Sequence, residues 1–463
     1  MGYIFQIAYD NDVAALKPEW WALEGLRVLE EQIVAPNLVN MDYNNHFASA
    51  GDVVHVNKPG TFVAKHKIRG SSTTVQDANA SDTQVKLDQH LEVTIVLDDL
   101  DLQKSLPDLR QYFLMPQLRA IAEGIDAAVV GTGAQFIANS AGTVGTALTD
   151  DAVIDLGRVF DDNNNVSDGR YLIVGSAGKA DLLKIDRFSD ADKSGQPSKF
   201  ISGEIGSIMG FRTFMSQTVG RSLAAGMTTT PEVADGAKAK GATVLAIDTA
   251  ATSHTVGTWL TIAGVPGVYR AATAVTGSST TSLTVSPGLR GAMADNAVIT
   301  FYEAAAALSK GTFAAGVIKV ITDGYTSAAE IPQRGSGITI DNSLTSGIYT
   351  VTAVEGTWVN STTEITLVLN RPLDEAVAND KVINVMPVGG SYNMAFCKDA
   401  ITLVNRPLAP AAAGVAASVQ NNGAFSLRAT IGYDMDIMRH RITLDTLIGV
   451  KVLDVAKGAV LLN

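Results

Sequence analysis

The stretch GYDMDIMRHRITLD, residues 432–445, places three aspartates, two arginines and a histidine within fourteen positions. As one strand it puts Asp434, Asp436 and His440 on the same face, where carboxylate and imidazole groups could together bind a metal ion. The same alternation is typical of a half-buried strand in a mixed sheet, whose aspartates pair with arginines of neighbouring strands or subunits. The sequence therefore favours a structural strand with interface ion pairs over an active site.

Two further motifs lack the spacing that their chemistry requires. VGSAGKAD has two residues between its glycines where a phosphate-binding loop has four, and an alanine follows Lys179 in place of a magnesium-binding Ser or Thr. DDNNNVSDG, residues 161–169, has the composition of a calcium loop, but its sixth position holds Val166 and its twelfth holds Leu172. We therefore expect a strand-to-helix turn and a polar turn, without phosphate or metal.

The histidines and the cysteine supply no recognisable site. HExxH, GxSxG and ligand pairs at helical spacing are absent from the sequence. His55 and His66 could face each other across a hairpin, but zinc needs further ligands that no pattern supplies. Cys397 is the single cysteine, which excludes a disulfide or a multi-thiolate metal site within one chain. Because it lies in the apolar run NMAFCKDAITLV, we expect an inert, buried thiol. The sequence thus nominates no catalytic, cofactor-binding or metal-binding residue and implies no cofactor.

Composition narrows the class of protein. A chain of 463 residues is long enough for two to four compact units. The formal net charge of −12 argues against a dedicated nucleic-acid binder, because attraction to phosphates needs clustered Lys and Arg. The N-terminal residues lack the features of a signal peptide, and no apolar stretch is long enough to span a membrane. We expect a protein made and kept in a cytoplasm, with no membrane partner.

The first 135 residues predict two helices and a hairpin. KPEWWALEGLRVLEEQIVAPNLVN predicts a helix that Pro18 opens and Pro36 closes. Its apolar residues at helical steps are Trp21, Leu23, Leu26, Leu29 and Ile33. Residues 51–103 predict a long hairpin with a polar tip, which needs a partner because two strands alone are marginal. A second helix begins near Ser105, and Pro116 could kink it. Its apolar stripe is Leu114, Leu118, Ile121, Ile125 and Val129.

Helices and strands then alternate before the composition changes. DDAVIDLGRVFDDNN predicts a helix, GRYLIVGSAGKADLLKID a strand and a helix, and FRTFMSQTV a strand. Residues 223–388 are rich in Thr, Gly, Val and Ala, and a run of strands closes the chain.

The Thr- and Gly-rich segment contains an internal repeat. GVYRAATAVTG at 267–277 matches GIYTVTAVEG at 347–356, and SPGLRGAMADNAVITF at 286–301 matches NRPLDEAVANDKVINVM at 370–386. The aligned pairs are Tyr269 with Tyr349, Leu289 with Leu373, and Ile299 with Ile383. Since two copies are too few for a solenoid, the repeat predicts two small β modules inserted into a host domain.

The order of these elements resembles the major capsid proteins of tailed bacteriophages, which share the Hong Kong ninety-seven type of shell fold. The motifs that carry the resemblance are GDVVHVNKPG, GRYLIVGSAGKADLLKIDRF with GEIGSIMGFRTFMSQTV, FCKDAITLVNRPL, and LRATIGYDMDIMRHRITLDTLIGVKVL. They lie outside residues 223–388 and are most similar to the podovirus-like coat proteins that carry an inserted β domain. The two-module insertion departs from the single barrel of that branch. The implied fold class is α+β, with a long spine helix, an extended hairpin, peripheral and axial domains and inserted all-β modules.

The resemblance implies a division of the chain into segments. They are an N-terminal arm (1–50), an extended hairpin or E-loop (51–103), a peripheral domain with the spine helix (104–168 and 424–463), an axial domain (169–222 and 389–423) and an inserted β domain (223–388) with two related modules (about 236–305 and 306–388). The arm and the hairpin would reach across to neighbouring subunits. The axial domains would meet at the centres of capsomers.

The function that the resemblance implies is structural, without catalysis. The chain would assemble into the pentamers and hexamers of an icosahedral shell around a double-stranded DNA genome, in the host bacterial cytoplasm, and end in the virion. Its partners would be other copies of itself, a scaffolding protein, a portal, a decoration protein and packaged DNA without sequence-specific binding. Two alternatives stay open: a tail-tube or other virion protein, and a carbohydrate-binding surface protein with Trp259 and Trp358 as stacking platforms.

Overall fold

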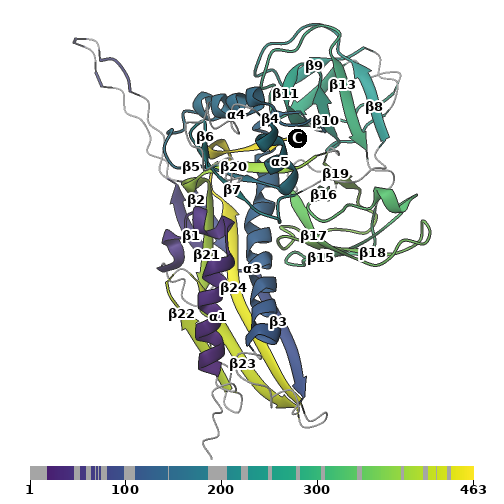
Figure 1. The fold of residues 1–463 in the computed structure, drawn as a ribbon. Coiled ribbons are helices and arrows are strands. Elements are labelled where there is room, and N and C mark those ends of the chain that lie inside the picture. The colour runs from purple at the N-terminus through teal and green to yellow at the C-terminus, as the bar shows by residue number, and fades with distance from the viewer. Residues whose placement is uncertain are drawn as a thin grey trace, which may run out of the picture.

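The structure is a computed structural model of the whole chain. It describes residues 18–45, 53–58, 64–67, 69–70, 72–73, 81–98, 110–143, 145–185, 206–220, 228–248, 253–277, 282–303, 308–340, 347–386, 390–409, 416–423, 425–434 and 439–463. Helices and strands occur together, which confirms the predicted α+β class. Figure 1 shows an elongated body with two β modules attached along one side. Among the described residues, no helix is long and apolar enough to cross a membrane.

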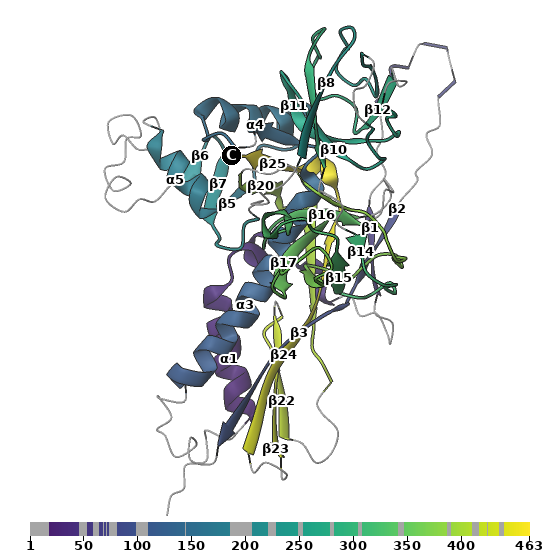
Figure 2. The ribbon, with the colours of Figure 1, turned by 90° about the vertical axis from the view of Figure 1, so that its right-hand side faces the viewer.

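One half of the body consists of two helices lying on an antiparallel sheet. The helices are α1 (Pro18–Gln32) and α3 (Met115–Val130), and the strands are β3 (Gln89–Asp98), β21 (Ile401–Arg406), β22 (Ala416–Asn421), β23 (Ser426–Asp434) and β24 (Arg439–Val452). The strand order is β21-β24-β23-β22, and β3 pairs with β24. Both helices cover the same face of the sheet (Figure 2). Alternation along β24 explains this arrangement, because Ile442 and Leu444 are fully buried while Arg439 and Arg441 are exposed.

Helix α1 packs within its own chain, although the resemblance implied an arm that reaches to neighbours. Trp21 and Leu29 are fully buried in the main core with α3 and β23. Beyond the helix, the Leu403 amide donates to the Asn40 carbonyl over 3.0 Å, which holds the segment along β21. The expectation that the arm reaches neighbouring subunits stays a prediction, and residues 18–45 also pack on their own chain. Leu23, predicted on the apolar face, is 63% exposed.

Helix α3 is the spine of the body. Its five predicted stripe residues are all buried. A π-helical turn, η5 (Arg110–Leu114), precedes it, and Pro116 lies in its first turn, where the proline's missing amide costs no hydrogen bond. In place of the kink expected at Pro116, the structure has a π-helical turn that ends at Leu114, just before the α-helix begins. The predicted cap Ser105 lies outside the described residues. A 3₁₀ segment, η6 (Gly131–Phe136), continues the spine.

The other half of the body is a mixed sheet with the order β4-β25-β20-β5-β7-β6. Its strands are β4 (Ser140–Gly142), β5 (Arg170–Val174), β6 (Ser207–Ile208), β7 (Phe211–Met215), β20 (Tyr392–Cys397) and β25 (Gly458–Leu462), with helices α4 (Asp150–Asp162) and α5 (Ser176–Lys184) beside them. Thr149 caps α4 by accepting a bond from the Ala152 amide over 3.3 Å. Leu156 and Phe160 of α4 pack on Leu172 of β5 in a second core.

These two sheets group the strands differently from the predicted peripheral and axial segments. Strands β4 and β25, from the predicted peripheral ranges, lie in the sheet of β5 and β20. Strands β21 and β22, from the predicted axial range, lie in the sheet of β24. Pairing between strands far apart in sequence leaves no local pattern. The predicted boundaries of the peripheral and axial domains therefore differ from the boundaries of the two sheets.

The hairpin is shorter than the predicted residues 51–103. Strands β1 (Val53–Lys58) and β2 (Ser81–Lys86) pair antiparallel, from Val53 opposite Lys86 to Lys58 opposite Ser81. Val56, Val85 and Leu87 pack at its base on Val404 of β21. The following strand, β3, leaves the hairpin and pairs with β24 along ten residue pairs.

The insertion forms two six-stranded units, which we name barrel 1 (228–303) and barrel 2 (308–386). Barrel 1 contains β8 (Thr228–Val233), β9 (Val244–Ala246), β10 (Trp259–Ile262), β11 (Val265–Ala271), β12 (Ser282–Ser286) and β13 (Val298–Glu303). Barrel 2 contains β14 (Leu308–Ser309), β15 (Lys319–Asp323), β16 (Gly337–Ile340), β17 (Tyr349–Glu355), β18 (Ile365–Leu369) and β19 (Ile383–Val385).

The two barrels have the same cyclic strand order. Numbered within each unit, the strands of barrel 1 follow 1-6-3-4-5-2 and those of barrel 2 follow 1-2-5-4-3-6. If each sheet is closed into a ring, the order of barrel 1 read backwards from its first strand is the order of barrel 2. Single bridges close both rings, between Ala234 and Ile247 in barrel 1 and between Leu308 and Val382 in barrel 2.

The residues that the sequence repeat aligned occupy equivalent places. The amide of Arg290 donates to the hydroxyl of Tyr269, and the amide of Asp374 donates to the hydroxyl of Tyr349, each over 3.0 Å. Burial raises the pKa of both tyrosines. The turn before the last strand of each barrel also repeats a left-handed residue, with φ of 58° at Asn296 and 60° at Asp380. The barrels are therefore two versions of one module.

Candidate functional site

The stretch 432–445 is a β-hairpin, which corrects its interpretation as one strand. Strand β23 ends at Asp434 and β24 begins at Arg439, so Asp434 lies opposite Arg439 and Tyr433 opposite His440. The rings of Tyr433 and His440 meet edge to face with centroids 4.8 Å apart. Asp436 lies outside the described residues. Asp434 and His440 therefore lie on opposite faces of the hairpin, because the chain reverses direction between them.

The glycine motif after β5 forms a turn that packs on a side chain. The Gly175 amide donates to Asn393 Oδ1 over 2.9 Å, and a Cβ on Gly178 would lie 2.7 Å from the same oxygen. Asn393 also donates to the Leu461 carbonyl over 3.1 Å. The glycines thus allow α5 to approach the central strand β20. This close packing explains why the turn contains glycines, and it agrees with the strand-to-helix turn expected from the sequence.

The calcium-like stretch 161–169 is tied to neighbouring protein groups. Asp161 accepts from the Arg170 guanidinium over 2.7 Å. Asn163 and Asn165 both donate to the Ala456 carbonyl, over 3.2 Å and 2.7 Å. Across the ranges that the structure describes, no group of three or more His, Cys, Asp or Glu side chains could hold a metal ion.

Cys397 lies at the end of β20 and is half-buried. It packs against the second core, beside α4 and β5. Burial raises the pKa of its thiol, so at neutral pH the sulfur is held as the less reactive protonated form.

Both tryptophans considered for sugar stacking pack against other parts of the chain, Trp259 in the main core and Trp358 against the core of barrel 2. Trp259 is 1% exposed, and the Arg270 guanidinium lies 5.2 Å from its ring centre. Burial lowers the pKa of Arg270 to about 10. The indole of Trp358 donates to the Tyr325 carbonyl over 3.2 Å. The ring of Trp259 therefore presents no open face of the kind that a sugar would stack on, whereas Trp358 is half-buried.

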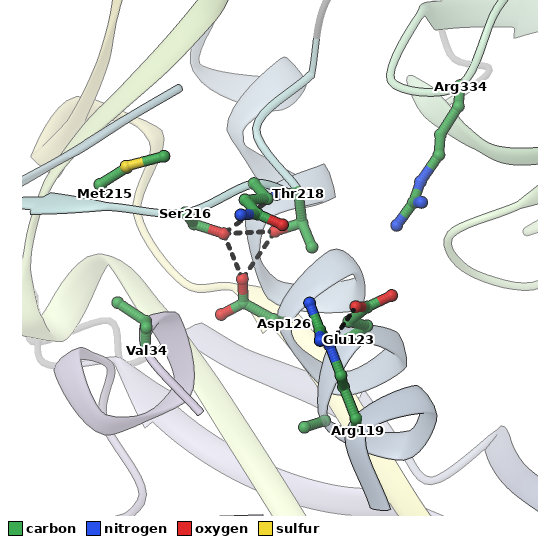
Figure 3. A pocket seen from close by; sticks show the side chains of 10 residues that line it. Val34, Arg119, Glu123, Asp126, Met215, Ser216, Thr218 and Arg334 are labelled. Atoms are coloured by element: carbon green, nitrogen blue, oxygen red, sulfur yellow. Dashed lines mark hydrogen bonds and ion pairs between the residues drawn. The ribbon is translucent and has the colours of Figure 1, made fainter. Parts of the chain in front are cut away.

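The clearest polar site in the described residues surrounds Asp126 on the spine helix. Its carboxylate accepts from the Ala35 amide over 2.8 Å, from the Thr218 hydroxyl over 2.6 Å and from the Ser216 hydroxyl. Figure 3 shows Ser216 and Thr218 converging on this carboxylate. Asp126 is 7% exposed. One buried carboxylate thus joins the segment after α1, the spine and the end of β7, a set we name the Asp126 junction.

A cavity of about 440 Å³ adjoins the Asp126 junction. Arg119 and Glu123, one turn apart on the spine and 3.3 Å from each other, line one wall. Arg334 of barrel 2 extends toward them from the opposite side (Figure 3). The walls of the cavity carry side chains of both signs of charge, and the cavity lies between barrel 2 and the spine helix.

Both barrels contact the continuation of the spine, at residues 131–139. From barrel 1, Arg290 donates to the Ala138 carbonyl over 2.9 Å and to Asn139 Oδ1. From barrel 2, the Thr350 hydroxyl donates to the Gly131 carbonyl over 2.9 Å. These contacts attach both barrels to the same segment of the body.

The sequence analysis missed the Asp126 junction, although one signal was present. Asp126 interrupts the buried face of the spine helix between Ile125 and Val129, and a charged residue at such a position needs partners. The partners themselves, Ala35 and Ser216, lie 91 and 90 residues away. No local pattern links them.

Comparisons with known proteins find similarity in structure alone. No family model and no curated protein matches the chain. Similar solved structures include Mycobacterium phage Che8, with 14% identity over 93% of this chain and 90% of that chain and a TM-score of 0.42. They also include the capsid of the cyanophage P-SCSP1u, with 12% identity over 92% and 86% and a TM-score of 0.43. The capsid of a native GTA particle has 7% identity over 92% and 90% and a TM-score of 0.39. Values this low assign no function to the chain.

Proposed function

We propose that the chain is the major capsid protein of a tailed bacteriophage. Copies of it assemble into pentamers and hexamers, which form the icosahedral shell around a double-stranded DNA genome. The proposal combines the capsid-like sequence motifs with a subunit shape suited to lateral contacts. It assigns the protein no catalytic activity.

The observation that carries the proposal is the hairpin of β1 and β2. These two strands form a sheet of their own in the described residues. The described residues beyond them, 64–67, 69–70 and 72–73, are all exposed and project away from the body (Figure 1). A two-stranded hairpin is marginal in water, so an arm of this kind gains stability when a neighbouring copy covers it.

The rest of the body supports repeated lateral contact. Its spine helix and its longest strand, β24 with 14 residues, run along an elongated, layered body (Figure 2). Strand β22 ends one side of the sheet, and an open strand edge is a natural place for a neighbour to pair. Identical contacts repeated around a ring close into capsomers, and capsomers close into a shell.

The proposal assigns roles to the remaining parts and partners. The axial domains meet at capsomer centres, and the two barrels lie on the outer surface or brace neighbouring capsomers. A scaffolding protein, a portal and a decoration protein take part in assembly. Packaged DNA fills the lumen without sequence-specific binding, and assembly takes place in the host cytoplasm.

A carbohydrate-binding surface protein is the weaker candidate, because Trp259 is enclosed and Trp358 donates its indole N–H to the chain itself. A tail-tube protein would share the β-rich composition. It would form open tubes or stacked rings instead of shells.

Electron microscopy of the recombinant protein tests the proposal. The chain is expressed alone and together with the viral genes that neighbour its own. Closed shells, polyheads or capsomer rings are the expected result. A stable monomer under both conditions would contradict the proposal, and tubes of stacked rings would favour the tail-tube alternative.

A further inference from the structure

A small cavity lies where helix α5, the segment after β7 and barrel 2 meet. Its volume is about 190 Å³, and its walls are the turn into α5, residues 217–219, Ser391 and the loop of Arg334 and Gly335. We name it the α5 cavity. A Cβ on Gly220 would lie 2.6 Å from the Gly335 carbonyl oxygen, so the body and the loop of barrel 2 are in close contact beside it.

The α5 cavity has a positive charge that its own walls do not balance. Among the described residues that line it, Arg334 alone is charged. No ion pair or hydrogen bond within the described part of the chain involves the Arg334 guanidinium, which extends from barrel 2 in Figure 3. Thr218 also lines the cavity, but its hydroxyl donates to Asp126, which lines the larger cavity instead.

Ser391 adds a buried hydroxyl to the same space. The residue is 4% exposed. Its amide donates to Asn463 Oδ1 over 3.1 Å and its carbonyl accepts from the Asn463 amide over 3.3 Å, which leaves the side chain to face the cavity. Across the described residues, no hydrogen bond involves this hydroxyl. Because a buried hydroxyl without a hydrogen bond is costly, its position indicates a ligand in the cavity.

The first residue of α5 supplies a third kind of donor. Ser176 begins this helix of nine residues and lines the cavity, and Gly175 before it offers no side-chain cap. Within the described ranges, no acceptor is bonded to the Ser176 amide. The peptide dipoles of a helix concentrate positive partial charge at such an end, where anions bind. Guanidinium, hydroxyl and amide donors therefore surround one small space from three different parts of the chain.

We propose that the α5 cavity binds a free phosphate-type oxyanion. Arg334 pairs with the anion, while Ser391 donates its hydroxyl and Ser176 its amide. The oxygens of a phosphate point in several directions and so can meet all of these donors. With about 30 Å³ for each water molecule, the cavity has room for a phosphate and a few waters and is too small to enclose a nucleotide. The bound anion links barrel 2 to the body.

This site differs from the nucleotide loop considered for VGSAGKAD. That motif lacks the spacing and the magnesium-binding residue of a nucleotide loop, and Lys179 does not line the cavity. The expectation of a turn without phosphate therefore stands for a nucleotide with magnesium. A lone oxyanion needs only the helix end and a cation, and the cation comes from barrel 2. The inference does not rest on the proposed function, because binding is measured on the folded chain in any state of assembly.

Calorimetric titration of the full chain with sodium phosphate at neutral pH tests the proposal. Sodium chloride at equal ionic strength is the reference. Phosphate is expected to bind saturably and to raise the melting temperature, since a ligand stabilises the state that binds it. It is also expected to slow hydrogen exchange of the Gly335 amide, which donates to the Val351 carbonyl over 2.7 Å in the loop of Arg334. Chloride is expected to have none of these effects.

Substitutions in the walls locate the anion. Arg334→Gln is expected to weaken phosphate binding at least about tenfold, the usual effect of losing a charge-assisted hydrogen bond. Ser391→Ala is expected to weaken it by about three- to tenfold. Arg119→Gln is the matched control, because Arg119 lines the larger cavity but not the α5 cavity. It is expected to bind phosphate like the wild type, and circular dichroism checks that each variant is folded.

Two substitutions at Ser176 test the helix end. Proline is favoured at the first position of a helix, and the extended Gly175, with ψ of 175°, is compatible with a following proline. Ser176→Pro removes the amide donor and the hydroxyl, while Ser176→Ala removes the hydroxyl alone. Phosphate binding is expected to weaken more in Ser176→Pro than in Ser176→Ala.

The inference would be overturned by phosphate binding no tighter than chloride, or by unchanged binding in Arg334→Gln. An equal loss in Arg119→Gln would move the anion to the larger cavity. Adenosine monophosphate is the second probe and is expected to bind more weakly than phosphate. If it instead bound more tightly and lost its binding in Arg334→Gln, the site would belong to the phosphate of a nucleotide and not to free phosphate.

Discussion

At the scale of single residues, Asp126 is the polar group on which the most segments depend. Replacement by Ala removes the acceptor of the Ala35 amide and of two hydroxyls, and Ala35 is fully buried. An unsatisfied buried donor costs about 1–3 kcal/mol, so Asp126→Ala is expected to lower the free energy of unfolding by about 2–4 kcal/mol. Urea unfolding measures the loss, and hydrogen exchange of the Ala35 amide locates it.

Two variants make this prediction specific. Asp126→Asn keeps one oxygen acceptor and is expected to cost less than Asp126→Ala. Glu123→Gln changes an exposed carboxylate one turn earlier on the spine and is expected to cost at most about 0.5 kcal/mol. Equal losses in Asp126→Ala and Glu123→Gln, or an unchanged exchange rate at Ala35, would show that the buried carboxylate does not hold the junction.

At the scale of elements, the hairpin depends on one close approach to the long strand. A Cβ on Gly449 of β24 would overlap the carbonyl oxygen of Lys86 and lie 3.0 Å from its carbon. Because these are backbone atoms at the base of the hairpin, they can yield only if β2 moves. Gly449→Ala is therefore expected to lower stability by about 1–3 kcal/mol, as overpacking does, and to speed hydrogen exchange along β1 and β2.

Gly432 provides the matched control, because it lies in the adjacent strand β23 and a Cβ added there would meet no atom within 4 Å. Gly432→Ala is expected to leave stability within about 0.5 kcal/mol of the wild type. If both substitutions behave alike, the hairpin base does not rest on β24.

The elements also show how far sequence reasoning reaches. The apolar stripe of α3, the helix at 150–162 and the strand-to-helix turn at Gly175 follow from local periodicity, and the structure contains all three. The partner of β3 does not follow, because β3 pairs with residues 439–448 at the far end of the chain. The turn between Asp434 and Arg439 was missed because alternating residues continue across it. Local patterns therefore predicted elements well and their pairing poorly.

At the scale of the whole molecule, the way the insertion is connected to the body indicates that it could be removed as a unit. The Tyr392 amide donates to the Gly220 carbonyl over 2.9 Å, so the chain leaves the body and returns to it at adjacent points. Neither body sheet contains a strand from residues 228–386. A short Gly-Ser loop could therefore replace residues 221–390 without stretching the body or removing a strand from it.

The body without its barrels is expected to fold, with reduced stability. Trp259, Val268 and Met386 belong to the main core, and their loss uncovers part of it. Removing a buried Trp side chain alone costs about 3–5 kcal/mol, so the deletion is expected to cost at least that much.

Hydrogen exchange tests whether β24 and β25 stay protected, and Trp259→Ala in the full chain measures the core loss separately. Loss of protection in both strands, with Trp259→Ala still folded, would mean that the barrels are required for the fold of the body. Retained protection would instead establish the body as an independent domain, to which the two barrels are attached by contacts that include those of Arg290 and Thr350.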